Sequence, residues 1–267
     1  MKDLKYLFAY TVPISVYISF MSTGIWTYST VFYVFILLPI LDFLLGESKE
    51  NFSKEDASHQ NKKWIFDIML YFNIPIIFGL LYIVFSSFQL NDYNVFETVG
   101  LAFSTGLLLS INGINVAHEL GHRKPYYERF LSKLLYMPCL YMHFYIEHNF
   151  GHHLHVATPE DGATAKYNQS VYSFWFTSVT KQYFDAWKNQ KKLLKTKNSS
   201  FISVKNDMIW YHLIQPLYLF VIYYLFSFEV MIFALAVGII SFLFLECINY
   251  IEHYGLQRLK LASGRYE

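Results

Sequence analysis

WIFDIMLYFNIPIIFGLLYIVFSSF, residues 64–88, holds a single charged side chain, Asp67. An α-helix rises about 1.5 Å per residue, so a run of this length exceeds the roughly 30 Å hydrocarbon core of a bilayer. The stretch therefore predicts a helix that spans a membrane.

Five more apolar runs accompany it, at residues 4–20, 25–45, 93–116, 209–228 and 230–251. Short turns join the six runs in pairs, so the expected fold class is an all-α integral membrane protein with six transmembrane helices in three hairpins. A shorter run, 130–145, is too interrupted for a span and is expected to be amphipathic or re-entrant. The composition agrees, because 15% of the residues are charged, against about 25% in soluble domains.

The basic residues predict the topology. All 21 Lys and Arg lie at the N-terminus, in 46–63, in 123–205 or after residue 254, and none lies in the three short turns. With six spans, these segments fall on one side of the membrane, which the positive-inside rule makes the cytoplasmic side. Both termini are then cytoplasmic. The net charge of +1 gives no reason to expect a nucleic-acid partner.

Histidines gather in short groups. His118 and His122 belong to His-Glu-Leu-Gly-His, and residues i and i+4 of a helix share a face. The second group, Glu-His-Asn-Phe-Gly-His-His at 147–153, places His148 and His152 on one face in the same way. His153 adds an imidazole about 100° further round that helix.

A third group, Asn-Tyr-Ile-Glu-His-Tyr-Gly at 249–255, contributes His253. All three groups lie on the basic side of the expected topology, so the membrane itself brings them to one depth. Imidazole suits iron, zinc, copper and nickel. More imidazoles than a single tetrahedral ion uses suggest two metal ions. The sequence therefore predicts a histidine-rich metal site at the cytoplasmic face.

Several neighbouring groups are candidates to support or join the ligands. Glu246 lies in an expected span, where a carboxylate is a functional candidate, and it could bind metal or hold the histidine of the third group. Glu119, Glu147 and Glu252 each adjoin a candidate ligand, and His143 lies just before the second group. Each could orient a ligand through a hydrogen bond.

These motifs resemble a known family. Residues 118–123 resemble the first histidine box of bacterial membrane alkane 1-monooxygenases, which belong to the wider group of membrane desaturases and hydroxylases. Residues 147–153, running on to Val-Ala-Thr-Pro-Glu-Asp at 156–161, resemble the second box and its tail. Residues 249–258 resemble the segment most diagnostic of the family.

The resemblance implies a function and a site. The family inserts one atom of O₂ into the terminal methyl group of an alkane at a centre of two non-haem iron ions, with electrons from rubredoxin. It implies a multi-pass protein of the bacterial inner membrane, in contact with lipid, that takes an alkane or another lipid-soluble substrate. The implied metal ligands are His118, His122, His148, His152, His153 and His253.

The sequence departs from the family pattern in three places. Gly162 and Lys166 stand where proline and arginine are usual, which bears on loop geometry. The family also continues past a segment like residues 264–267 to a third box of the form His-x-x-His-His. The chain ends before that box, so we expect a single transmembrane domain, 1–267, truncated at its C-terminus.

Other functions remain open at this point. The nearest is another membrane di-iron enzyme, a fatty-acyl desaturase or an aryl-methyl hydroxylase. An intramembrane zinc protease would use Glu119 as general base, but a single zinc ion has no use for the further histidine groups. A metal transporter would place its ligands along a path through the bilayer, whereas these are expected at one face.

Overall fold

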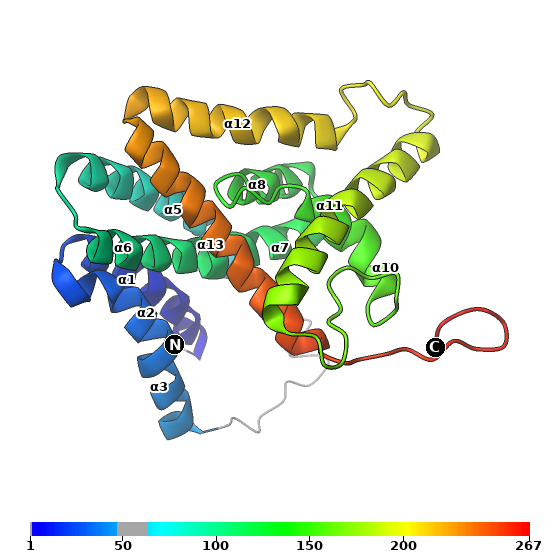
Figure 1. The fold of residues 1–267 in the computed structure, drawn as a ribbon, viewed down its shortest axis with the longest axis horizontal. Coiled ribbons are helices and arrows are strands. Elements are labelled where there is room, and N and C mark those ends of the chain that lie inside the picture. The colour runs from blue at the N-terminus through cyan, green and yellow to red at the C-terminus, as the bar shows by residue number, and fades with distance from the viewer. Residues whose placement is uncertain (1, 47–63) are drawn as a thin grey trace.

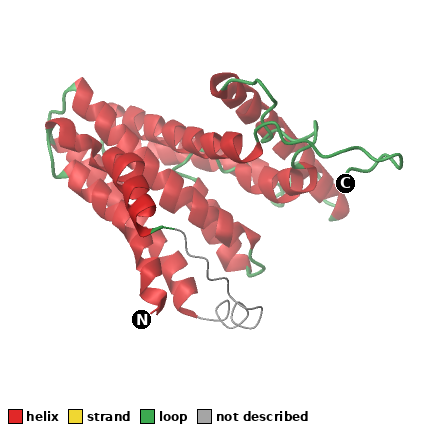
Figure 2. Ribbon diagram, turned by 90° about the horizontal axis from the view of Figure 1, so that it is seen from below, coloured by secondary structure: helices red, strands yellow, loops and turns green. Residues whose placement is uncertain are grey.

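The computed structural model describes residues 2–46 and 64–267. Its regular secondary structure is helical in that part of the chain, apart from one isolated bridge between Lys260 and Tyr266, as Figure 2 shows. The all-α prediction is confirmed for these residues. The basic segment 46–63, used in the topology argument, lies outside the described residues except for its first member.

In the described residues, five helical segments are long and apolar enough to cross a membrane. They are Gly24–Leu45, Trp64–Leu90 (α5), Val95–His122, Asp207–Leu225 (α12) and Phe228–His253 (α13). Their bounds differ from those of five expected spans by six residues at most, because the thickness of a bilayer dictates the length of an apolar run.

The first expected span, 4–20, is helical but is not among these five segments. It is divided into a 3₁₀ helix, η1 (Lys2–Tyr10), and a short α-helix, α1 (Thr11–Phe20). The α-helical part alone, 10 residues long, rises about 15 Å, which is half of a hydrocarbon core, and the 9 residues of η1 make up the remainder of the segment. Six spans are therefore not confirmed.

Polar side chains attach α1 to its neighbours. The hydroxyl of Ser19 lies 2.8 Å from that of Ser29, 3.1 Å from that of Thr30 and 3.2 Å from that of Ser104. Ser29 and Thr30 belong to α2 (Ser29–Phe32), which follows η2 (Gly24–Tyr28) and precedes η3 (Tyr33–Leu37) and α3 (Leu38–Leu45). Inside a bilayer the hydrophobic effect does not drive helices together, so interhelical hydrogen bonds of this kind contribute to their association.

The span Val95–His122 is the central helix of the protein. It consists of α6 (Val95–Leu108), the π-helix η4 (Leu109–Ile114) and α7 (Asn115–His122). In the most apolar stretch of this span, 78% of the residues are buried inside the protein. The corresponding share is 39% or less in each of the other four spans. The helix α13 crosses it and packs on α6 and η4, as Figure 1 shows.

Five further helices lie between α7 and α12. They are α8 (Tyr126–Tyr136), α9 (Phe144–Glu147), η5 (His148–His152), α10 (His153–His155) and α11 (Val171–Thr196). The run 130–145 forms the end of α8 and an irregular connection to α9. The helix α8 is amphipathic, because it buries Ser132 and Leu135 and exposes Tyr126 and Phe130.

A substitution at Gly106 tests the packing between α6 and α13. A Cβ at Gly106 would lie 2.4 Å from Cγ2 of Ile240, so Gly106→Ala forces the two helices apart. We expect the free energy of unfolding to fall by about 1–3 kcal/mol, measured as a lower thermal midpoint in detergent. The control is Gly79→Ala on α5, where nothing lies within 4 Å of the added atom. Equal losses in the two variants would contradict this packing.

Candidate metal centre

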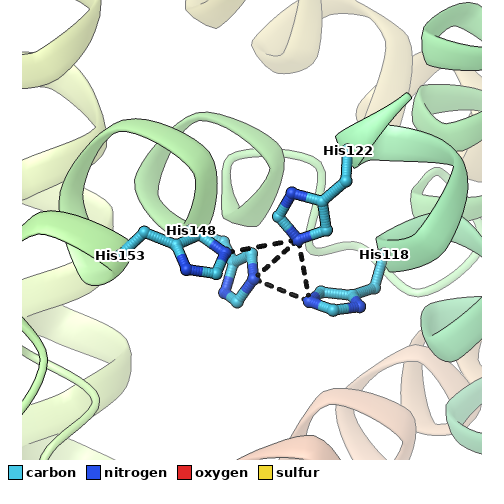
Figure 3. A group of neighbouring side chains, drawn as sticks. All are labelled: His118, His122, His148 and His153. Carbon is cyan, nitrogen blue, oxygen red and sulfur yellow. Dashed lines mark hydrogen bonds between the residues drawn. The ribbon is translucent and has the colours of Figure 1, made fainter. Parts of the chain in front are cut away.

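Four histidines converge on one point at the end of α7. His118 and His122 come from α7, His148 from η5 and His153 from α10, and one ligand nitrogen of each lies within 4.8 Å of the other three. The Nε2 atom of His118 lies 2.7 Å from that of His148. The Nε2 atom of His122 lies 3.1 Å from that of His118 and 3.3 Å from those of His148 and His153 (Figure 3).

The two histidines of α7 meet as the sequence predicts, since they are one turn apart on a helix. The second group is different, and its expected α-helical geometry is wrong. Residues His148–His152 form a π-helix, in which a turn takes an extra residue. The N–H of His153 donates to the carbonyl of His148, five residues earlier. The ring of His153 consequently lies 4.4 Å from that of His148.

His152 faces a second position beside the four-histidine cluster. Its ring stacks at 5.3 Å from that of His148 and lies 5.0 Å from that of His253, at the end of α13. The structure thus brings all six predicted ligands into one region, where the ends of α7 and α13 meet η5. Four of them share one point, and His152 and His253 adjoin it.

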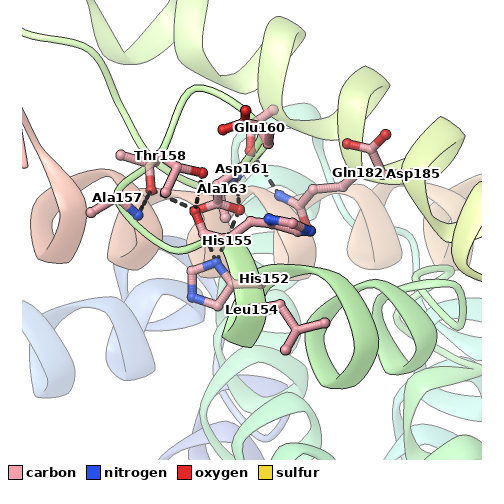
Figure 4. Close-up of polar contacts among 12 residues, drawn as sticks. His152, Leu154, His155, Ala157, Thr158, Glu160, Asp161, Ala163, Gln182 and Asp185 are labelled. Carbon is pink, nitrogen blue, oxygen red and sulfur yellow. Dashed lines mark hydrogen bonds and ion pairs between the residues drawn. The ribbon is translucent and has the colours of Figure 1, made fainter. Parts of the chain in front are cut away.

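Asp161 fixes the orientation of His152, as Figure 4 shows. The carboxylate lies 3.0 Å from Nδ1 of His152, and it accepts hydrogen bonds from the Thr164 hydroxyl at 2.5 Å and the Ala163 N–H at 3.2 Å. Burial favours the neutral acid, but the contacts to His152, Thr164 and Ala163 hold the pKa of Asp161 below its ordinary value. An ionised carboxylate only accepts, so His152 donates from Nδ1 and keeps Nε2 for a metal.

Sequence reasoning did not assign this role to Asp161. The residue lies in the loop after α10, nine positions beyond His152. Loop residues carry no periodicity that would place a carboxylate against a given ring. The only signal was its place in the Glu-Asp tail that follows the second histidine group.

Two imidazoles of the cluster, His148 and His153, are held in the neutral form. Burial lowers the pKa of His148, and the neighbouring imidazoles His118, His152, His153 and His122 lower it further. Burial and His122 also lower the pKa of His153. Neutral imidazole is the form that binds a metal ion, so this donor set fits a nitrogen-ligated transition metal such as iron.

Glu246 is buried and makes other contacts than the one expected. Its carboxylate accepts hydrogen bonds from Tyr141 at 3.0 Å, Ser178 at 2.7 Å and Gln182 at 2.9 Å. Within the described residues, none of its side-chain hydrogen bonds reaches His253. Its polar contacts with Ser178 and Gln182 tie α13 to α11.

In the part of the chain that the structure describes, the other three carboxylates make no side-chain hydrogen bond to a candidate ligand. Glu119 pairs with Arg123 at 3.3 Å, and Glu252 is exposed. Glu147 is buried, which raises its pKa, and it lines a polar cavity of about 310 Å³ with Asp161.

His143 is packed between aromatic rings rather than against a ligand. Its ring lies 4.4 Å from that of Tyr141 and 5.5 Å from that of Tyr183. Burial, with a smaller contribution from His212, lowers the pKa of His143 to about 3. Among the described residues, its buried Nε2 has no hydrogen-bond partner.

Comparisons with known proteins agree with the geometry. Residues 94–266 match the fatty acid desaturase family. Alkane 1-monooxygenase 2 of Alcanivorax borkumensis is 32% identical over 96% of this chain and 68% of its own length. Alkane 1-monooxygenase 2 of Pseudomonas aeruginosa is 34% identical over 91% of this chain and 65% of its own length. The chain thus spans about two thirds of these relatives.

A third relative carries a different name. The xylene/toluene monooxygenase hydroxylase component XylM of Pseudomonas putida is 26% identical over 97% of this chain and 69% of its own length.

Asp161→Asn tests the hydrogen bond that orients His152. An amide can offer its N–H₂ group to Nδ1, which turns the ring or changes its tautomer. We expect the affinity for Fe²⁺ or Co²⁺ to fall by about 10- to 100-fold, measured by metal titration of the purified full-length protein. Asp185→Asn is the control, because Asp185 pairs with Lys181 and Lys188 instead. An unchanged affinity in Asp161→Asn would contradict the orienting role.

Proposed function

This chain belongs to the alkane 1-monooxygenase family, within the fatty acid desaturase group, and we propose that it hydroxylates the terminal methyl group of medium- to long-chain n-alkanes to primary alcohols. The observation that carries the proposal is the convergence of His118, His122, His148 and His153 beside the pair His152 and His253. The names of the relatives supply the substrate class.

The proposed cofactor is a pair of non-haem iron ions. His118, His122, His148 and His153 would hold one ion, and His152 and His253 would contribute to the second. When bound, the irons supply the activation of O₂ that an unreactive methyl group requires. The protein contributes neutral imidazoles, a fixed ring orientation at His152 and a site at the ends of apolar helices.

The proposed reaction consumes R–CH₃, O₂, two electrons and two protons, and releases R–CH₂OH and water. A rubredoxin-type carrier is the proposed electron donor. The alkane would come from the bilayer, into which it partitions. We also propose six spans in three hairpins, with the basic segments and both termini on the cytoplasmic side of a bacterial inner membrane.

A second candidate function is aryl-methyl hydroxylation, which the similarity to XylM favours. A third is desaturation, which the breadth of the fatty acid desaturase family supports. The three reactions share a metal site and differ in product. The six gathered histidines argue against a zinc protease, since one zinc ion takes four ligands.

Product analysis tests the proposed function. Membranes containing the full-length protein receive octane, ¹⁸O₂, NADH and a rubredoxin with its reductase. The expected product is 1-octanol that carries ¹⁸O. Labelled benzyl alcohol from toluene without octanol would support the aryl-methyl alternative, and an unlabelled alkene from a fatty-acyl substrate would support desaturation. Either of these results, together with no octanol from octane, would overturn the proposal.

His148→Ala tests whether the cluster performs the reaction. His148 contacts both His118 and His122, so its removal opens the centre of the donor set. We expect the rate of octanol formation to fall by more than about 100-fold, because even the partners of metal ligands are worth 10- to 100-fold. His155→Ala is the matched control, since His155 lies outside the cluster and lines the polar cavity. A normal rate in His148→Ala would refute the site.

A further inference from the structure

A second, strongly basic cavity is lined by none of the six clustered histidines. It has a volume of about 350 Å³ and opens between α8, α11 and the segment that leads into α12. Four cationic side chains line it, Arg129, Lys133, Lys197 and Lys205, together with a single carboxylate, Asp207. Positive charge is thus concentrated in a space of small volume.

The one carboxylate is already paired. The ammonium group of Lys133 lies 2.7 Å from Asp207 and 4.9 Å from the centre of the Tyr145 ring. The other three cations have no ion-pair partner within the described part of the chain. The cavity therefore presents three uncompensated positive charges to whatever enters it.

The cavity lies at the membrane boundary. Asp207 begins the spanning helix α12, and α8 follows closely after the end of the span Val95–His122. Two apolar side chains of its lining stay largely exposed: Val204 is 80% exposed and Phe130 is 56% exposed. Ile202, two residues before Val204, is 84% exposed. Exposed apolar groups beside lysines are typical of surfaces that sit in the headgroup region.

The segment 199–206 is held in place before any ligand binds. Gln190 donates to the carbonyl of Lys205 at 3.1 Å. Asn206 donates to the carbonyl of Phe201 at 2.9 Å, and Trp210 donates to that of Val204 at 3.0 Å. A backbone fixed in this way loses little conformational freedom on binding, which favours affinity.

We propose that this cavity binds the phosphate headgroup of an anionic phospholipid, with Arg129, Lys197 and Lys205 around the phosphate and the acyl chains along the exposed apolar rim. Basic pockets between helices at headgroup depth bind anionic lipids. The confined volume favours one headgroup over the broad face of an acidic protein. The apolar rim favours a lipid over a soluble phosphate.

Native mass spectrometry of the full-length protein tests the proposal, with phosphatidylglycerol and phosphatidylcholine titrated in detergent. We expect tighter binding of one phosphatidylglycerol. The triple variant R129Q/K197Q/K205Q should weaken it by about 100-fold and Lys205→Gln alone by about fivefold, since each basic residue near an anionic lipid contributes a factor of about five. The single variant keeps the test valid if the triple variant fails to fold.

The matched control is K124Q/K191Q/K195Q, which removes three exposed lysines outside the cavity. We expect its phosphatidylglycerol affinity to stay within about threefold of the original, because exposed surface charges act weakly at this distance. An equal loss in the control would overturn the site, since net charge alone would then explain binding.

Two further measurements distinguish the lipid from a soluble phosphate and from an acidic protein. Displacement of phosphatidylglycerol by millimolar glycerol 3-phosphate would identify a soluble phosphate as the ligand and overturn the lipid assignment. A triple variant that keeps its phosphatidylglycerol affinity but loses binding of a rubredoxin would assign the cavity to an acidic protein. Failure of glycerol 3-phosphate to compete, with rubredoxin binding unchanged, would support the lipid site. None of these readouts depends on hydroxylation.

Discussion

The rest of this structure depends on the close approach of four imidazole nitrogens. These atoms lie within 4.8 Å of one another. Burial and the neighbouring rings keep His148 and His153 neutral, and each neutral ring has one nitrogen with a lone pair. Lone pairs packed this closely repel unless a cation or a shared proton lies between them. A metal ion relieves the repulsion at all four rings together, which is why the geometry favours a metal centre over a set of buried polar anchors.

The surrounding fold holds these rings through contacts that leave the metal-facing nitrogens free. The π-helix η5 directs His148 and His153 to one point, while Asp161 takes Nδ1 of His152. Further along α13, hydrogen bonds from three side chains to Glu246 fasten that helix to α11 and to the segment before α9. Buried carboxylates are costly unless they are fully paired. The hydrogen bonds described here satisfy the carboxylates of Asp161 and Glu246, and they fix the helix ends that carry the histidines.

Much of this arrangement could be predicted from sequence, for physical reasons. A bilayer requires a minimum length of apolar helix, so runs such as 64–88 mark spans, and the ends of spans bring His122 and His253 to one depth. The π-helix at His148–His152 was not predictable, because the extra residue in its turn leaves no mark on an apolar pattern. Partners such as Asp161, and the three donors that occupy Glu246, depend on tertiary packing. The division of 4–20 into η1 and α1 was also not predictable from the apolar pattern.

The most direct test of the central claim is the metal content and ligand set of the full-length protein, purified from membranes in mild detergent. Iron analysis combined with X-ray absorption at the iron edge measures both. The account predicts about two irons per chain with a first shell rich in imidazole nitrogen, the donor that iron accepts from histidine. One zinc per chain, with no iron, would contradict it and would leave the six gathered histidines serving a different chemistry.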